Sequence, residues 1–307
     1  DRWQAGRAML PGPPCYTASA MNTTFAVLAA AAYLAFLAPL AGALGREVRD
    51  PGSGAQRLRE VRGLDLWAVF GVLVLHALAF AFATRGDDAF RFGFAQALSA
   101  MLLLAVVFFA IESVRAPIGA IRLVLYPGAA LAVLLPLLYP GAQTSVGGGP
   151  GFVAHLTLAL VSYGMFSLAA LHAIAMVLID QSLHAHGLRA EANARGWISV
   201  LLDLAPPLLV MERLLFRALT IGFVLLTATL VTGVGFHEYL FGRPLRFDHK
   251  TVFSILSWLT FGVLLYGRWR YGWRGRLALR YVFGGFIALV LAYIGTHFVF
   301  EVFLGRR

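Results

Sequence analysis

Eight apolar stretches, each about as long as a helix that crosses a bilayer, constrain this chain more than any other feature. A spanning helix needs roughly 20 mostly apolar residues, because the hydrocarbon core is about 30 Å thick. The stretches are residues 24–44, 65–84, 94–112, 121–139, 152–180, 216–235, 249–267 and 278–304. The chain is 60% hydrophobic and 13% charged, whereas soluble domains carry about 25% charged residues. The sequence therefore predicts an all-α polytopic membrane protein with eight transmembrane helices.

The distribution of arginine predicts the orientation of these helices. The loops after the first, third, fifth and seventh stretches are rich in arginine, the loops between them are poorer, and residues 140–151 contain no charge. Because loops with many positive charges stay in the cytoplasm, we expect both termini on the extracytoplasmic side. The net charge of +10 then reflects topology, so the expected partner is a lipid bilayer and no nucleic acid. We predict a multi-pass protein of a bacterial inner (cytoplasmic) membrane.

Residues 1–20 differ from the rest of the chain, since they contain the proline-rich run from Leu10 to Pro14 and precede Met21. We expect a disordered or misassigned extension there, and a single transmembrane domain over residues 21–307. The one cysteine, Cys15, lies in this extension. A single cysteine excludes disulfides within the chain, Cys₄ zinc sites and iron–sulfur clusters.

Two further segments have irregular features. The fourth apolar stretch contains Pro127 and Pro136, and proline removes a backbone donor from a helix. We therefore expect this span to be kinked or re-entrant. The segment 181–212 is the only long loop predicted on the cytoplasmic side, and an amphipathic helix at the membrane surface is expected within it.

Half of the eight histidines lie inside the apolar stretches or at their ends, namely His76, His155, His172 and His297. Ionisable side chains at membrane depth are costly, and they mark a functional site by default. Neutral imidazole is a common ligand of transition metals and of haem iron. The alternative is that each histidine makes one hydrogen bond between helices, as polar residues in membrane bundles often do.

The depths of these histidines suggest two pairs. His155 and His297 both lie in the outer halves of their spans, where two helices can present them to one ligand. His76 and His172 lie roughly 16 and 12 Å from the cytoplasmic face, at about 1.5 Å of rise per residue. Those depths are compatible with one bound group shared by His76 and His172 near the cytoplasmic side. Hydrogen bonds that only hold helices together explain this pair at least as well.

The outer loop over residues 232–251 combines four aromatic residues with charges of both signs. Phenylalanine rings can stack on a macrocycle, and arginine or lysine can pair with its carboxylates. An aromatic belt at the membrane interface is the alternative. The candidate residues of this loop are Phe236, Phe241 and Phe247 as a platform, Arg243, Arg246 and Lys250 as cations, and Asp248.

The same loop carries a resemblance to a known family. In chain order stand Thr232-Gly233, Gly242, Asp248, Lys250-Thr251, Trp258 and Gly272-Trp273-Arg274-Gly275, with His155 and Ser162-Tyr163 upstream and Tyr293-Ile294-Gly295 downstream. This pattern resembles the cytochrome c assembly superfamily of haem-handling membrane proteins, the CcsA and CcmC type. It is most similar to the HemX-like or YpjD-like inner membrane branch, and it covers roughly residues 65–305.

The resemblance implies that His155 is the first outer haem ligand, but other family positions differ. The tryptophans of the family's loop are replaced here by phenylalanine. The family's second outer histidine falls near Leu304 or Gly305, so His297 is an offset substitute. The helix after the loop has Tyr266-Gly267-Arg268 where the family often carries a histidine. His76 and His172 are therefore candidates on their own evidence and are not carried over from the family.

The leading functional hypothesis is a haem-binding or haem-delivering accessory protein in cytochrome c assembly, with haem as cofactor. It is not predicted to be an enzyme. Expected partners are haem and other cytochrome c maturation proteins or an apocytochrome. One alternative is a small-solute or metal-ion transporter, suggested by His76, His172 and the proline-containing span. The other is a membrane regulator of haem biosynthesis, suggested by the HemX-like resemblance.

Overall fold

The structure is a computed structural model that describes residues 16–39, 42, 65–85, 90–114, 121–144, 150–188, 207–241 and 249–292. Within these ranges, side chains are described except at positions 16–19, 65–66, 143–144, 150, 182–188 and 236–241. The predicted site residues Arg243, Arg246, Phe247, Asp248 and His297 lie outside the described residues.

Every apolar stretch overlaps one helix of the described part of the chain. These helices are α1 (Tyr16–Ala35), α4 (Asp65–Ala83), α5 (Phe94–Ser113), α6 (Arg122–Leu138), α7 (Pro150–Leu188), α9 (Leu208–Phe241), α10 (His249–Tyr271) and α11 (Gly275–Val290). Helices α5, α7, α9 and α10 contain segments long and apolar enough to cross a membrane, and α1, α4 and α6 contain shorter apolar segments. The prediction of an all-α polytopic membrane protein is confirmed, whereas the number of spans and the orientation of the termini stay predictions.

Several helix boundaries differ from the predicted ones. Helix α1 begins at Tyr16 and so includes the last five residues of the predicted extension, with the Thr24 hydroxyl donating to the Ala20 carbonyl at 2.9 Å. Helix α7 continues to Leu188, and α9 begins at Leu208. Parts of the expected interfacial segment 181–212 therefore extend transmembrane helices, and its middle lies outside the described residues. The 39 residues of α7 rise about 58 Å, well beyond the roughly 30 Å of the hydrocarbon core.

Helix α6 is one uninterrupted helix with Pro127 and Pro136 inside it, so the prolines do not divide the fourth span into two segments. Its buried face includes Leu125, Tyr126 and Ala129 and packs against α1 and α5. The edges of the Phe109 and Tyr126 rings meet at a centroid distance of 6.0 Å. Prolines are tolerated in transmembrane helices that pack against neighbouring helices in this way.

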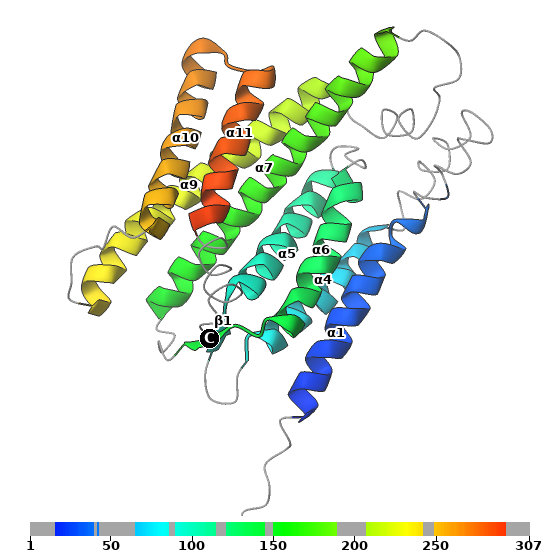
Figure 1. Cartoon of the computed structure of the whole chain (residues 1–307), viewed down its shortest axis with the longest axis vertical. Helices are drawn as coiled ribbons and strands as arrows, with labels where there is room; N and C mark the ends of the chain where they lie inside the picture. The colour runs from blue at the N-terminus through cyan, green and yellow to red at the C-terminus, as the bar shows by residue number, and fades with distance from the viewer. Residues whose placement is uncertain are drawn as a thin grey trace, which may run out of the picture.

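A short sheet, which the sequence did not predict, joins two of the loops. Strand β1 (Phe90–Phe92) pairs antiparallel with β2 (Ala142–Thr144). The Gln96 side chain supports it by donating to the Tyr139 carbonyl at 3.2 Å and accepting from the Gly93 amide at 3.0 Å. The sheet lies at the same end of the molecule as the start of α7 (Figure 1).

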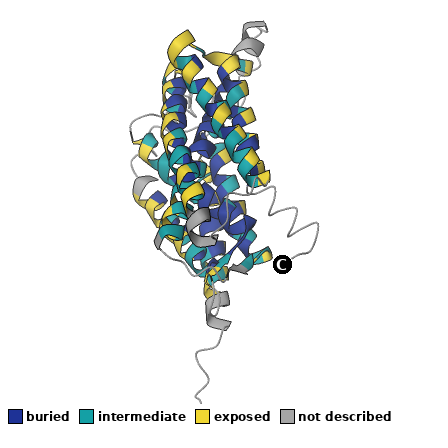
Figure 2. Cartoon of the chain, turned by 90° about the vertical axis from the view of Figure 1, so that its left-hand side faces the viewer, coloured by how far each residue is buried: buried dark blue, intermediate teal, exposed yellow. Residues whose placement is uncertain are grey.

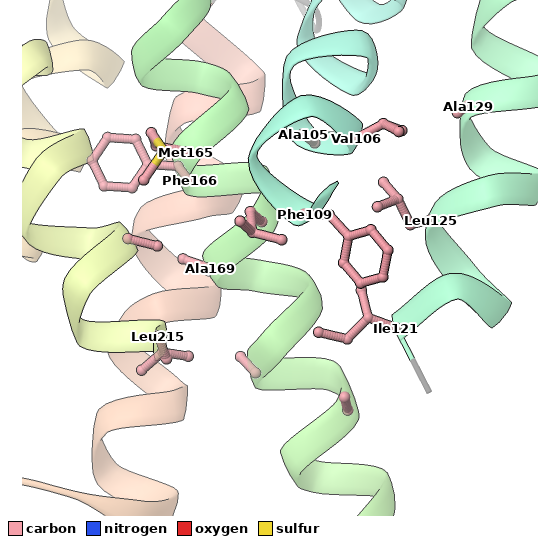
Figure 3. Close-up of a cluster of buried hydrophobic side chains, with 14 of the residues drawn as sticks. Ala105, Val106, Phe109, Ile121, Leu125, Ala129, Met165, Phe166, Ala169 and Leu215 are labelled. Atoms are coloured by element: carbon pink, nitrogen blue, oxygen red, sulfur yellow. The ribbon is translucent and has the colours of Figure 1, made fainter. Parts of the chain in front are cut away.

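The helices form two groups that meet along one seam. Helices α1, α4, α5 and α6 pack with one another, as do α7, α9, α10 and α11, and the contact between α5 and α7 joins the two groups (Figure 1). Phe109 and Leu125 of the first group belong to the same buried cluster as Phe166 and Leu215 of the second (Figure 3). The apolar core is thus continuous across the seam.

Large apolar side chains also cover the outside of the bundle. Trp67, Leu131, Val224 and Trp269 are each more than 60% exposed, and exposed residues lie on helix faces turned away from the buried ones (Figure 2). Such a surface is unfavourable in water but suits contact with lipid tails, whose apolar character matches these side chains.

Two glycines allow a stacked aromatic pair to hold the second group together. Phe166 of α7 and Phe261 of α10 stack with ring centroids 4.0 Å apart and planes 7° from parallel. A Cβ atom on Gly222 of α9 would lie 3.1 Å from the Phe166 ring, and one on Gly285 of α11 would lie 2.7 Å from the Phe261 ring. Because glycine has no side chain, the four helices can approach this closely. Small residues at helix contacts are common in membrane bundles.

Substituting Gly285 is therefore expected to destabilise the protein. In Gly285→Ala the added methyl group overlaps a Phe261 ring that Phe166 prevents from moving away, and overpacking of this kind costs about 1–3 kcal/mol. The control is Gly284→Ala, since a Cβ atom there meets nothing within 4 Å. That variant should be neutral, or more stable by up to about 1 kcal/mol through helix propensity. Free energies of unfolding in detergent micelles test this, and equal losses in both variants would contradict it.

Candidate functional site

His155 lies in the second turn of α7 and contacts the last turns of α9. Its Nδ1 atom is 2.9 Å from the hydroxyl oxygen of Thr232. That hydroxyl is itself held by its own helix, because its oxygen lies 2.8 Å from the Ala228 carbonyl and 3.1 Å from the Thr229 carbonyl. The contact joins α7 and α9, which pack along much of their length (Figure 1).

These distances favour one of the two tautomers of His155. A carbonyl oxygen only accepts hydrogen bonds, and a hydroxyl has a single proton to donate. When the Thr232 hydroxyl donates toward the Ala228 or Thr229 carbonyl, its oxygen accepts from His155. The proton of the neutral imidazole is then on Nδ1, and the lone pair is on Nε2. Neutral imidazole with a lone pair on one nitrogen is the form that coordinates metals.

Gly233 lets α9 approach the same ring. A Cβ atom at this position would lie 3.2 Å from Cε1 of His155 and 4.0 Å from its Nδ1. Thr232 and Gly233 thus act on His155 together, one through a hydrogen bond and the other by leaving room. The Thr-Gly pair, noted in the sequence only as part of a family pattern, contacts the predicted ligand histidine.

The rest of the predicted outer site is only partly described. Phe236 and Phe241 belong to the last turns of α9, but their side chains are outside the description. Lys250 lies in the first turn of α10 and is partly exposed. The pairing of His155 with His297, and the roles of Arg243, Arg246, Phe247 and Asp248, stay predictions.

His76 is fully buried within the first group of helices. Its Nδ1 lies 3.0 Å from the Tyr33 hydroxyl of α1, and its Nε2 lies 3.0 Å from the Ser99 hydroxyl of α5. The edge of the Tyr33 ring also meets the imidazole, with centroids 5.7 Å apart. His76 therefore links α1, α4 and α5 through both ring nitrogens.

His172 is fully buried at the seam between the two groups. Its Nδ1 lies 2.8 Å from the Leu168 carbonyl of its own helix, and its Nε2 lies 3.2 Å from Oε2 of Glu112 on α5. Because the carbonyl only accepts, Nδ1 carries a proton. The 3.2 Å approach of Nε2 to Oε2 does not have hydrogen-bond geometry, and within the described residues neither atom has another hydrogen-bond partner.

These contacts place His76 and His172 at different levels of the bundle. Their partners on α5, Ser99 and Glu112, are 13 positions apart, a rise of about 20 Å along the helix. One iron therefore cannot bind both imidazoles, although depth along the sequence made a shared ligand conceivable. Each nitrogen of both rings also faces a polar partner, which a ligand would have to displace. Either histidine alone as a haem ligand stays a prediction.

The partners of these histidines were harder to predict than the histidines themselves. Of these partners, only Thr232 stood out in the sequence, as part of a family pattern. Tyr33 and Ser99 carried no signal, because isolated hydroxyl residues are common in apolar helices. Within the described ranges no three His, Cys, Asp or Glu side chains come together to hold a metal ion.

Comparison with known proteins shows which protein family this chain matches. Residues 64–304 match the family described as "Cytochrome C assembly protein". The "Inner membrane protein YpjD" of Escherichia coli K12 is 36% identical over 170 residues, which are 55% of this chain and 59% of that protein. The "Cytochrome c biogenesis protein CcsA" of Prochlorococcus marinus strain MIT 9312 is 26% identical over 157 residues, which are 48% of this chain and 50% of that protein.

The chain thus spans between half and three fifths of the length of these relatives. No solved structure matches it. The family match, by contrast, includes more than half of the chain and begins just before α4, so that it contains His76, His155, His172 and the Thr232-Gly233 pair. The chain therefore belongs to the cytochrome c assembly protein family.

Proposed function

We propose that this protein binds haem at His155 and delivers it during cytochrome c biogenesis. Membership of the cytochrome c assembly family supports a role in cytochrome c biogenesis, and so does the printed name of the Prochlorococcus relative. The name of the Escherichia coli relative supports a place in the inner membrane, which agrees with the apolar outer surface of the bundle. The partners would be haem and other proteins of cytochrome c maturation.

The contact of His155 with Thr232 is the observation that carries this proposal. With the Thr232 hydroxyl donating along its own helix, the imidazole proton is on Nδ1 and Nε2 would be the coordinating atom. Ligand histidines in proteins usually donate their other N–H group to an oxygen in this way. Haem, when bound, supplies an iron that coordinates imidazole and propionates that pair with cations. The residues of this chain fit that group, with His155 as an axial ligand.

The other roles in this proposal come from the outer loop. His297 would be the second axial ligand, Phe236, Phe241 and Phe247 would stack on the macrocycle, and Arg243, Arg246 and Lys250 would pair with the propionates. Asp248 would belong to the same loop surface. Two histidine ligands suit transport or electron transfer, because oxygen chemistry needs an open position on the iron.

The absorption spectrum of the detergent-purified protein tests the function. After reconstitution with haem and removal of the excess, we expect a Soret band and sharp α and β bands on reduction, with about one haem per chain. The band should disappear when the protein is unfolded in SDS. A preparation that stays colourless after reconstitution would contradict haem binding and favour a transporter or a regulator.

A further inference from the structure

We propose that Thr232 is a positioning residue that holds His155 in the tautomer whose Nε2 carries the lone pair. The inference rests on the proposed haem-binding function for its second readout only, because the tautomer itself can be measured without haem. It assigns a role to a residue that would not itself touch the ligand.

The Thr232 hydroxyl has two carbonyl acceptors on its own helix that compete with His155 for its proton. Threonine in a helix can direct its hydroxyl proton to the carbonyl three or four residues earlier. Here the oxygen is 2.8 Å from the Ala228 carbonyl and 3.1 Å from the Thr229 carbonyl. When either carbonyl accepts the proton, the lone pairs of the hydroxyl oxygen face the imidazole, and this is the arrangement that we propose.

The backbone at Gly233 holds the imidazole ring of His155 beside the Thr232 hydroxyl oxygen. A Cβ atom on Gly233 would lie 3.2 Å from Cε1 of His155, so the ring packs directly on the glycine that follows the threonine. A displaced ring would lose the 2.9 Å contact between Nδ1 and Thr232. The Thr-Gly pair therefore sets both the tautomer and the position of the ring.

The tautomer of His155 affects how well the histidine binds a ligand. In solution neutral histidine exchanges its proton between the two nitrogens, and only one tautomer offers Nε2 as a ligand atom. A group that accepts from the other nitrogen fixes the tautomer and raises the basicity of the ligand atom, and losing such a group typically lowers metal affinity 10–100-fold. Thr232 would supply such an acceptor from the neighbouring helix α9.

The experiment compares Thr232→Val, which keeps the shape and removes the hydroxyl, with Thr232→Ser, which keeps the hydroxyl. Nitrogen NMR of histidine-labelled protein without haem should report the Nδ1–H tautomer of His155 in the wild type and in Thr232→Ser. The His155→Ala spectrum identifies the signal. Thr232→Val should shift the signal toward the Nε2–H form.

Haem titration gives the second readout. Thr232→Val should weaken haem binding about 10–100-fold. Thr232→Ser should bind haem within about twofold of the wild type, because serine retains the accepting oxygen. Thr229→Val is the matched control, because that hydroxyl also bonds back along α9, to the Leu225 carbonyl at 2.8 Å. It should leave both readouts unchanged.

The outcomes separate this inference from the proposed function. A wild-type protein with the Nδ1–H tautomer but no haem binding would remove the function and keep the role of Thr232. A wild-type His155 in the Nε2–H form would overturn the inference, whatever the haem titration shows. The same holds if Thr232→Val leaves the tautomer unchanged.

Discussion

Replacing His155 by alanine is expected to abolish the Soret band of the reconstituted protein. The imidazole is the proposed axial ligand, and its Nδ1–H is held by Thr232 at 2.9 Å. The substitution therefore removes the proposed ligand atom, Nε2, together with the Nδ1–H group that contacts Thr232 of α9. We expect the haem content to fall at least about tenfold, which is the smallest effect typical of losing even an indirect contact to a metal site. The haem-to-protein ratio after gel filtration measures it.

Two variants make this result specific to coordination. His184→Ala removes a histidine that lies 29 positions further along α7, roughly 44 Å away along the helix axis, and it should bind haem like the wild type. In His155→Gly, imidazole added to the buffer should restore part of the Soret band, because a small free base can occupy the vacated space. If His155→Ala and His184→Ala retain equal amounts of haem, His155 is not the ligand.

Breaking the pair of Glu112 and His172 is expected to cause the largest loss of stability. His172 is fully buried and the Glu112 side chain is only 12% exposed, so little water can replace either partner when the other is removed. Loss of one member of a buried ion pair costs about 3–5 kcal/mol. His172→Leu and Glu112→Leu should each lower the free energy of unfolding by about that amount, measured by SDS titration in mixed micelles.

The double variant is the sharper measurement. Replacing both members of a buried pair by apolar residues of similar volume is often neutral or stabilising. The variant with both Glu112→Leu and His172→Leu should therefore be more stable than either single variant. The coupling energy of the cycle should lie at about 0.5–3 kcal/mol, as is usual for residues in contact. Simple additivity of the two losses would mean that the two side chains do not interact.

The two sets of contacts separate ligand binding from the assembly of the bundle. Thr232 and Gly233 act on His155 within the second group of helices. Glu112 and His172 join the two groups at their seam, where Gly164 of α7 also packs closely on the Leu104 side chain of α5. We therefore expect Glu112 variants to lose stability without changing the spectrum of the haem that they bind.

The sequence alone determined which segments are helical, and it predicted the bounds of some helices closely although those of α1, α7 and α9 differ. Helix α4 was expected at 65–84 and is found at Asp65–Ala83, and α5 was expected at 94–112 and is found at Phe94–Ser113. Length and apolar composition suffice for this, because a chain in a bilayer must satisfy its backbone hydrogen bonds within each segment. The position of His155 in its span, the Thr232-Gly233 pair and the family were also recognisable from local patterns.

Only the tertiary structure decided which of these residues meet. His76 and His172 have similar predicted depths, yet one contacts Ser99 and the other Glu112, at distant levels of α5. The pairing of β1 with β2 and the contact of His155 with Thr232 likewise join segments that are far apart in the chain. Helix adjacency depends on the packing of side chains such as Phe166 and Phe261 against glycines of neighbouring helices. Apolar periodicity within one span contains no information about that packing, because lipid and a neighbouring helix are equally apolar surroundings.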